Sequence, residues 1–243
     1  MIPKIIHYCW FGKGEMSLEI QKCIHSWHSY LPDYQLMLWN EDNLPSHTPF
    51  LKLLFKYKKW ALISDYIRLY ALYNYGGIYF DTDIEVIQSF DQLQNEKCFI
   101  GFQQESLIKH PLNGAVMGCI AKHHFIKTCL LYMTRSFYKD LKPVIGPWTV
   151  SEVCKQFGLK EYGEQYTEDI KILTKEVFYP YHWEESFTPQ CIQPNTLTIH
   201  RWQYSWKRHR NFKTLRKSAA YKIERGWFII KASIFKTPIE YAS

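Results

Sequence analysis

No two cysteines of this 243-residue chain are spaced as C-x-x-C, although the chain contains seven. They stand at positions 9, 23, 98, 119, 129, 154 and 191. An odd and scattered set of this kind indicates neither a zinc knuckle nor a disulfide framework. We therefore expect a protein of a reducing compartment.

Long apolar runs and glycine-rich phosphate-binding loops are also missing. The N-terminal segment MIPKIIHYCWFGKG has too short an apolar stretch for a signal peptide or a membrane anchor, so we expect a cytoplasmic protein. The loop 11–14, FGKG, matches neither G-x-G-x-x-G nor G-x-x-x-x-G-K-[ST]. This argues against dinucleotide-binding and P-loop sites.

The overall composition, 47% hydrophobic and 22% charged, is that of a soluble globular protein. Its formal charge of +7 is unevenly distributed. Residues 201–243 carry eleven Lys or Arg against two Glu, a balance of +9, which leaves −2 for the first 200 residues. We divide the chain into a main domain, 1–206, and a basic amphipathic tail, 207–243.

The hydrophobic pattern predicts an α/β protein. A strand at 4–10, a helix over 17–30 and a strand at 34–39 form a β-α-β opening, which is typical of a parallel sheet. Further expected elements are a helix over 60–74, strands up to Asp81 and at 84–87, 98–102, 115–119 and 196–200, and helices at about 122–137 and 149–157. Sites in such folds lie at the carboxyl ends of strands.

The stretch YNYGGIYFDTDIEVIQ, residues 73–88, places two carboxylates directly after an apolar run. In an extended segment Asp81 and Asp83 would face the same side, with Thr82 on the other. Two like charges this close are unfavourable unless a cation or hydrogen-bond donors share them. The alternative is a solvated strand end followed by a turn.

The helix over 60–74 is apolar almost all round and is therefore expected to be buried. It nevertheless carries Ser64, Asp65 and Arg68, the last two on one face at i, i+3. They form either a buried ion pair that fixes packing or the lining of a pocket that binds sugar hydroxyls. Because the helix ends just before the D-x-D strand, we favour the pocket.

Aromatic and histidine side chains follow the first and last expected strands. His7 is either a core residue or a ligand, and Trp10 either packs or stacks on a nucleotide base. His200 is a candidate third metal ligand beside the two aspartates, a set compatible with Mn²⁺ (or Mg²⁺). Ser205 and Trp206 can donate hydrogen bonds to a phosphate.

The segments IPKIIHYCWFG, KKWALISDYIRLYALYNYGGIYFDTDIEV and TIHRWQYSW together resemble glycosyltransferase family 32, a group of D-x-D sugar transferases. The block S-D-x-x-R-x-x-x-L-x-x-x-G-G-x-Y-x-D-x-D is complete from Ser64 to Asp83. It is also similar to the catalytic domain of large clostridial glucosylating toxins. The resemblance implies a GT-A fold (a Rossmann-like mixed sheet with flanking helices), a nucleotide-sugar donor, a divalent cation and retention of anomeric configuration.

The resemblance also implies residue roles. It implies catalytic roles for Asp65, Arg68, Asp81 and Asp83. It implies that the donor is bound by His7, Trp10, Ser64, Asp65, Arg68, Tyr79, Asp81, Ser205 and Trp206. The metal ligands that it implies are Asp81, Asp83 and His200. Family members often have two consecutive histidines before the final Ser-Trp, whereas here the second position is Arg201.

We therefore expect a retaining hexosyltransferase that uses a UDP-sugar and acts on a glycan or lipid-linked acceptor in surface polysaccharide synthesis, with residues 110–118 on the acceptor side. Two alternatives are a carbohydrate- or nucleotide-binding module without turnover and a haloacid-dehalogenase-type phosphatase. Glu85 and the position of the D-x-D far from the N-terminus argue against the phosphatase.

Apolar residues recur at steps of three or four over 212–234, with Lys and Arg between them, which predicts an amphipathic helix. This helix either packs on the domain with a solvated basic face or docks on an anionic membrane surface, where a lipid-linked acceptor would lie. No recognition module for nucleic acid accompanies it, so we expect no nucleic-acid partner.

Overall fold

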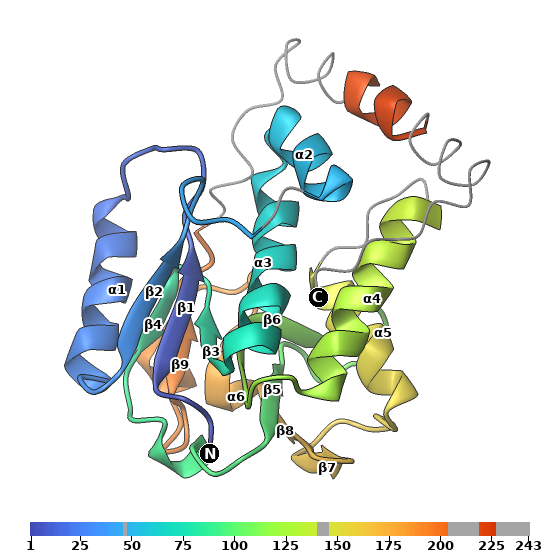
Figure 1. Cartoon of the computed structure of the whole chain (residues 1–243). Coiled ribbons are helices and arrows are strands. Elements are labelled where there is room, and N and C mark those ends of the chain that lie inside the picture. Colours follow the sequence, from blue (N-terminus) through green and yellow to red (C-terminus); the bar gives the residue numbers. More distant parts are fainter. Residues whose placement is uncertain (46–47, 140–145, 204–218, 227–243) are drawn as a thin grey trace.

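The structure is a computed structural model that describes residues 1–45, 48–139, 146–203 and 219–226 (Figure 1). The strands are β1 (Ile5–Cys9), β2 (Gln35–Trp39), β3 (Gly77–Phe80), β4 (Ile84–Val86), β5 (Cys98–Phe102), β6 (Leu112–Cys119), β7 (Gln165–Thr167), β8 (Ile170–Leu173) and β9 (Thr198–His200). The helices are α1 (Leu18–Tyr30), α2 (Pro49–Lys56), α3 (Trp60–Tyr75), α4 (His124–Lys139), α5 (Gly146–Gln156) and α6 (Lys175–Phe178), with short 3₁₀ turns at Asp91–Leu93 and Pro189–Cys191.

Seven strands form one mixed sheet in the order β2-β1-β3-β6-β5-β8-β7, and β4 pairs with β9 in a separate two-stranded sheet. The pairs β1–β2, β1–β3 and β5–β8 are parallel, and the other pairs are antiparallel. Helices flank the large sheet on both faces (Figure 1). This architecture confirms the predicted α/β class with a Rossmann-like mixed sheet.

Alternation along β3 divides the core into two layers. Ile78 and Phe80 pack with α1, α6 and the small sheet, whereas Tyr79 points to the layer formed with α2, α3, α4 and α5. All four residues of β3 are buried, as expected for a central strand covered on both faces. The D-x-D sequence therefore follows a strand that the core holds on both sides.

Two glycines join α3 to β3 in a turn that other residues fit poorly. The φ angles of Gly76 and Gly77 are +67° and +97°. A Cβ atom on Gly77 would lie 2.6 Å from the backbone oxygen of Ile5, and one on Gly76 would lie 2.7 Å from the backbone nitrogen of Ala121. The double glycine thus lets the chain reverse directly from helix to strand.

Several short elements were absent from the expectations. Thr48 caps the N-terminus of α2: its side chain accepts a hydrogen bond from Leu51 N, and Pro49 stands in the first turn. This capping pattern was a usable sequence signal. By contrast, β7, β8 and α6 have three or four residues each, too few for a period to be recognised.

The strand directions define the edge of the sheet where a site can form. Because β1 and β3 are parallel, with His7 opposite Tyr79, their carboxyl ends meet at one edge. Strand β6 runs the other way and begins at this edge, where the Ala115 oxygen accepts a hydrogen bond from Asp81 N at 2.9 Å. The residues that follow β1 and β3 therefore lie together with the start of β6.

The helical segment 219–226 contacts the main domain. Glu224 pairs with Lys56 of α2 at 2.7 Å, the Tyr221 ring is buried, and Arg225 donates to the Phe137 oxygen of α4 at 2.6 Å. These contacts correspond to the packed-helix interpretation for this part of the tail. The remaining tail residues, 207–218 and 227–243, lie outside the described part of the chain.

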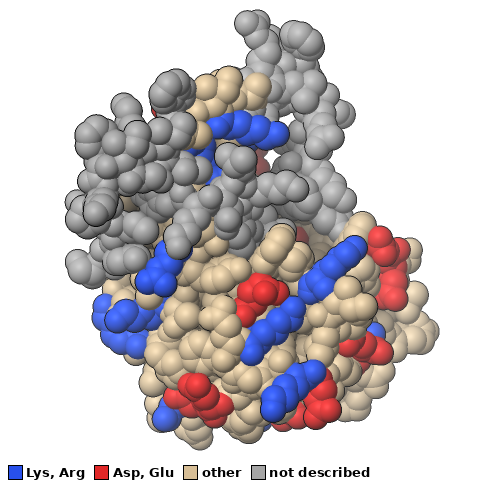
Figure 2. All heavy atoms as spheres, turned by 90° about the vertical axis from the view of Figure 1, so that its right-hand side faces the viewer, with Lys and Arg blue, Asp and Glu red and all other residues tan. Residues whose placement is uncertain are grey.

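Basic and acidic side chains intermingle over the described surface on the α4–α5 side (Figure 2), in keeping with the small net charge of the first 200 residues. Among the described residues, every helix is too short or too polar to cross a bilayer.

We predict that Gly77→Ala destabilises the fold, because a Cβ atom would meet the Ile5 oxygen at 2.6 Å in a backbone conformation that L-residues rarely adopt. The expected loss is about 1–3 kcal/mol in the free energy of unfolding, measured from urea midpoints. Gly14→Ala is the control, since no atom lies within 4 Å of its added Cβ. Equal midpoints for the two variants would contradict the prediction.

Candidate active site

The two aspartates of the D-x-D sequence are brought together by a turn rather than by an extended strand. Strand β3 ends at Phe80, and the Asp81 oxygen accepts a hydrogen bond from Ile84 N at 3.0 Å, which closes the turn. The extended course considered for residues 81–83 does not occur; the backbone follows the alternative of a strand end and a turn, and one oxygen from each carboxylate still lies within 4.8 Å of the other. The reason is that the chain must leave the large sheet here to enter β4 of the small sheet.

Arg68 connects the predicted helix pair to this turn. Its Nη2 lies 3.1 Å from Asp65 Oδ1 and 3.0 Å from Asp81 Oδ1. Tyr79 donates its hydroxyl hydrogen to the same Asp81 oxygen at 3.0 Å, and its ring lies 4.7 Å from the guanidinium carbon. The i, i+3 pair predicted on α3 is thus present and extends across to β3.

Burial and the neighbouring charges shift the pKa values of Arg68 and Asp65 in opposite directions. Burial alone would lower the pKa of Arg68, but Asp81, Tyr79 and Asp65 raise it above its ordinary value. Burial also raises the pKa of Asp65, against the opposing effects of Arg68 and of the hydrogen bond from Gly146 N at 2.9 Å. The guanidinium therefore stays charged, and its Nε has no hydrogen-bond partner among the described residues.

Asp83 is held by two residues that are more than 110 positions later in the chain, His200 and Gln203. Strand β9 pairs with β4, with His200 opposite Ile84, which places His200 Nε2 at 3.2 Å from Asp83 Oδ1. The second oxygen of Asp83 accepts a hydrogen bond from Gln203 N at 2.8 Å. Burial raises the pKa of Asp83, but the charge of His200 and these hydrogen bonds outweigh it and hold the pKa below its ordinary range.

Asp81, Asp83 and His200 form a donor set that fits a divalent cation. One ligand atom from each residue lies within 4.8 Å of the others. The contacts of Arg68 and Tyr79 with Asp81 both fall on Oδ1, so they do not occupy Oδ2, the second oxygen that a cation could use. Two carboxylate oxygens and one imidazole nitrogen suit Mn²⁺, which prefers oxygen-rich sets.

Of four further residues predicted to bind the donor, the structure describes Trp10 and Ser64 but not Ser205 and Trp206. Trp10 follows β1 at the carboxyl edge and donates its ring N–H to the Gly14 oxygen at 2.6 Å, and Ser64 is partly buried on α3, one residue before Asp65. Ser205 and Trp206 lie outside the described residues.

His7 is fully buried, and both of its ring nitrogens have partners in the core. Nε2 lies 2.8 Å from the Gly76 oxygen, and Nδ1 accepts a hydrogen bond from the ring N–H of Trp39 at 3.2 Å. Burial lowers the pKa of His7 to about 4, so the ring is neutral near pH 7. This geometry corresponds to the core-residue interpretation of His7.

Several residues that line the site carried no local sequence signal. A Cβ atom on Gly146, at the start of α5, would lie 2.4 Å from Asp65 Oδ1, and one on Gly114, in β6, would lie 3.2 Å from Arg68 Nη1. Both glycines permit a close approach of backbone to the charged network. They contact it across sequence separations of 81 and 46 residues, which a local pattern cannot reveal.

The departure from the family pattern at Arg201 has a structural counterpart. Its guanidinium contacts the Glu85 carboxylate through both Nε, at 2.6 Å, and Nη2. The next residue, Trp202, stacks on the His200 ring with centroids 3.7 Å apart. Arg201 therefore has its charge balanced by Glu85 and fixes the strand that carries His200.

Two family models match this chain. Residues 17–100 match the model described as "Glycosyltransferase sugar-binding region containing DXD motif", and residues 119–225 match the model described as "Alpha 1,4-glycosyltransferase conserved region". The first contains Asp65, Arg68, Asp81 and Asp83, and the second contains His200. These matches rule out the phosphatase alternative.

Known proteins show the same similarity. The chain is 27% identical over 193 residues to the lactosylceramide 4-alpha-galactosyltransferase of Rattus norvegicus, which covers 72% of this chain and 51% of the relative. It is 29% identical over 124 residues to inositol phosphoceramide mannosyltransferase 3 of Schizosaccharomyces pombe, covering 48% of this chain and 34% of the relative. The chain thus spans about half, or less, of the length of these curated relatives.

Solved structures agree in fold. The PaToxG glycosyltransferase superposes with a TM-score of 0.51 at 20% identity, covering 64% of this chain and 69% of that one. The glycosyltransferase GlyE of Streptococcus pneumoniae superposes with a TM-score of 0.50 at 9% identity, covering 99% of this chain and 65% of that one. The chain belongs to the D-x-D glycosyltransferases of the family 32 type and has the GT-A fold.

Proposed function

We propose that this chain is a metal-dependent, retaining hexosyltransferase that uses a nucleotide sugar, with a UDP-hexose as the expected donor. The observation that carries the proposal is the meeting of Asp81, Asp83 and His200 beside the Arg68 network. One end of such a site suits a cation and its pyrophosphate. The other suits the hydroxyl groups of the donor sugar.

The reaction breaks the bond between the anomeric carbon and the β-phosphate oxygen and forms a bond to an acceptor hydroxyl. A divalent cation held by the two aspartates and His200 would neutralise the charge that develops on the leaving nucleoside diphosphate. The carboxylates of Asp81 and Asp83 are already oriented by Arg68, Tyr79 and Gln203 N. Ligands fixed in this way need little rearrangement as the charge develops.

Asp65 and Arg68 are proposed to hold the donor sugar. Arg68 is 6% exposed, and its buried Nε has no hydrogen-bond partner among the described residues; we propose a donor-sugar hydroxyl as that partner. Asp65 can accept from another hydroxyl while Gly146 N fixes its orientation. We assign no side chain the role of a general base in this transfer.

The acceptor is proposed to be a glycan or a lipid-linked saccharide in surface polysaccharide synthesis. The names of two relatives mention lactosylceramide and inositol phosphoceramide, which supports a lipid-linked acceptor; the role in surface polysaccharide synthesis rests on the family resemblance. The name of the first relative specifies an α-linkage, and an α-linked product formed from an α-linked UDP-hexose keeps the anomeric configuration, which supports retention. The acceptor would approach from the side of residues 110–118, which include the start of β6 at the site edge.

Manganese and a UDP-hexose together should raise the melting temperature of the wild-type protein, whereas Asp83→Asn should abolish the manganese-dependent part of the shift. A ligand at 100 times its dissociation constant adds about 2.7 kcal/mol of stability, a shift of a few degrees. The measurement is thermal unfolding with a panel of UDP- and GDP-sugars, each with and without Mn²⁺.

Asp33→Asn is the matched control for this panel, since Asp33 is exposed and contacts only Lys4 at 3.4 Å in the described ion pairs. A shift that Asp83→Asn leaves unchanged would refute the metal assignment. Binding without donor hydrolysis or transfer would identify the alternative, a binding module without turnover.

Arg68→Lys should lower kcat/KM for sugar transfer by roughly 10²–10³-fold, the scale of losing one preorganised donor. Lysine keeps the charge but has no planar fork to contact Asp65 and Asp81 together. The manganese-dependent nucleotide shift should persist, because the aspartates that bind the cation remain. Arg135→Lys, on the exposed face of α4, is the control, and equal kcat/KM values for the two variants would contradict the role of Arg68.

We also propose that the basic tail, 207–243, binds the anionic inner surface of the cell membrane. Near such a surface each Lys or Arg contributes about 1 kcal/mol. Replacing Lys213, Arg216, Lys217 and Lys222 by Gln should therefore abolish co-sedimentation with phosphatidylglycerol vesicles at low salt. Unchanged, salt-insensitive sedimentation of the variant would exclude this role.

A further inference from the structure

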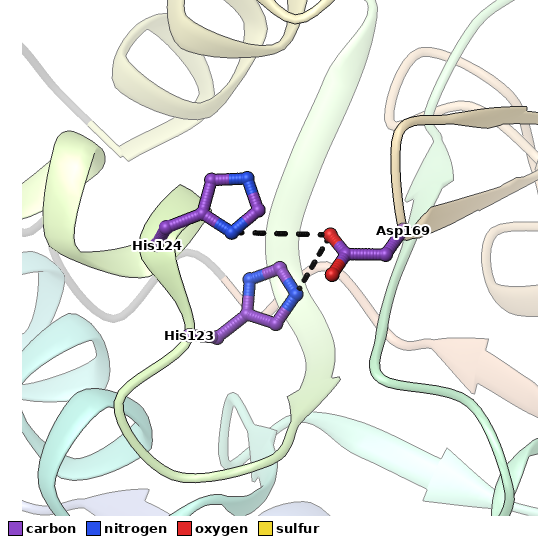
Figure 3. Close-up of side chains that lie close together, drawn as sticks. All are labelled: His123, His124 and Asp169. Atoms are coloured by element: carbon purple, nitrogen blue, oxygen red, sulfur yellow. Dashed lines mark ion pairs between the residues drawn. The ribbon is translucent and has the colours of Figure 1, made fainter.

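A second cluster of metal-binding side chains lies at the opposite edge of the sheet. His123 and His124 stand at the start of α4, and Asp169 lies in the turn between β7 and β8 (Figure 3). Cys119, at the end of β6, pairs with Gly77, the first residue of β3, so this edge holds the amino end of β3. The cluster is therefore separate from the D-x-D site and does not rest on the proposed function.

The distances in the cluster match those of a metal centre. His123 Nε2 lies 3.1 Å and His124 Nδ1 lies 3.9 Å from Asp169 Oδ1, as the dashed lines in Figure 3 show. One ligand atom from each residue lies within 4.8 Å of the others. Tetrahedral zinc with bonds of 2.0–2.2 Å separates its ligand atoms by roughly 3.4 Å, and the two observed distances bracket this value.

Two of these atoms are buried without a hydrogen bond. His123 has a side chain only 2% exposed, yet within the described part of the chain Nε2 has no hydrogen-bond partner, and neither has Asp169 Oδ1. The two atoms are close to each other, but not in the geometry of a hydrogen bond. Buried polar atoms are normally satisfied, and a cation bound by both atoms would satisfy this pair.

The surroundings of His124 favour a ligand role as well. Its Nε2 lies 2.8 Å from Glu168 Oε2, on the side of the ring away from the cluster. A hydrogen bond there places the proton on Nε2 and leaves the lone pair of Nδ1 directed toward Asp169. Histidines that bind metals commonly donate the other ring N–H to a carboxylate in this way.

Two neighbouring contacts compete with a cation but do not block it. Lys97 lies 3.6 Å from Asp169, but it approaches Oδ2 rather than the Oδ1 atom that faces the histidines. Phe125 N donates to His123 Nδ1 over a long 3.3 Å, a weak bond that is lost when Nδ1 carries the proton.

We propose that His123, His124 and Asp169 bind a transition-metal ion of the zinc class, with Glu168 orienting His124. Two imidazoles and one carboxylate suit Zn²⁺, Ni²⁺ or Co²⁺ better than the hard cations Mg²⁺ and Ca²⁺. With three protein ligands, water fills the fourth position. The ion cross-links the start of α4 and the β7–β8 turn, which are about 45 residues apart in the chain, and so stabilises this edge of the sheet.

The test measures zinc stoichiometry and affinity by calorimetry on chelator-treated, full-length protein. The Asp83→Asn background removes one ligand of the D-x-D site, so the zinc that remains reports on the second cluster. We expect one ion per chain in Asp83→Asn, and none at micromolar protein after a further Asp169→Asn or His124→Gln change. Glu168→Gln should weaken binding by roughly 10–100-fold, as orienting residues of metal sites do.

His28→Gln, in the last turn of α1, is the control and should leave zinc binding unchanged. His124 is half-exposed, so its substitution tests the site without removing a core side chain. Circular dichroism of each variant without metal confirms that it is folded. The proposal is overturned if Asp83→Asn binds no zinc, or if Asp169→Asn and His124→Gln bind it as tightly as their parent.

Discussion

The site depends on one buried positive charge that must be balanced from two elements. Arg68 is 6% exposed and contacts Asp65 on its own helix and Asp81 on the turn after β3. Removing one partner of such a buried pair leaves a charge uncompensated, at a cost of about 3–5 kcal/mol. The need to balance the charge of Arg68 fixes the distance between α3 and β3. It also explains the glycines at 114 and 146, where an added Cβ atom would lie 3.2 Å from Arg68 Nη1 and 2.4 Å from Asp65 Oδ1.

The same constraint decides how the two ends of the chain meet. Because Asp81 is fixed by Arg68 and Tyr79, the chain turns out of the large sheet at this point and forms β4. Strand β9 can then pair with β4, and the register places His200 against Asp83. Arg201 secures this pairing through Glu85. The candidate cation site thus combines residues more than 110 positions apart in the chain.

The sequence predicted what is local and missed what depends on distant contacts. The apolar surface of 60–74 predicted a buried helix, and the i, i+3 spacing predicted the contact between Asp65 and Arg68, both of which the structure contains. The sequence left open whether Asp81 and Asp83 continue the strand or follow it in a turn, because the contacts that hold this turn come from Arg68 and from β9, far away in the chain. The hydrogen bond from Gly146 N joins residues 81 positions apart, and no periodic pattern encodes that separation.

The two clusters at opposite edges of the sheet differ in ligand chemistry in a way that would separate two cations. The D-x-D set has two carboxylates and one imidazole, whereas the second set has two imidazoles and one carboxylate. Oxygen-rich sets favour manganese or magnesium, and nitrogen-rich sets favour zinc. Zinc nevertheless binds most mixed sets more tightly than manganese does, because affinity rises along the first-row series. On the two proposals together, the nitrogen-rich cluster would take up zinc first and leave the D-x-D site to the manganese or magnesium proposed there.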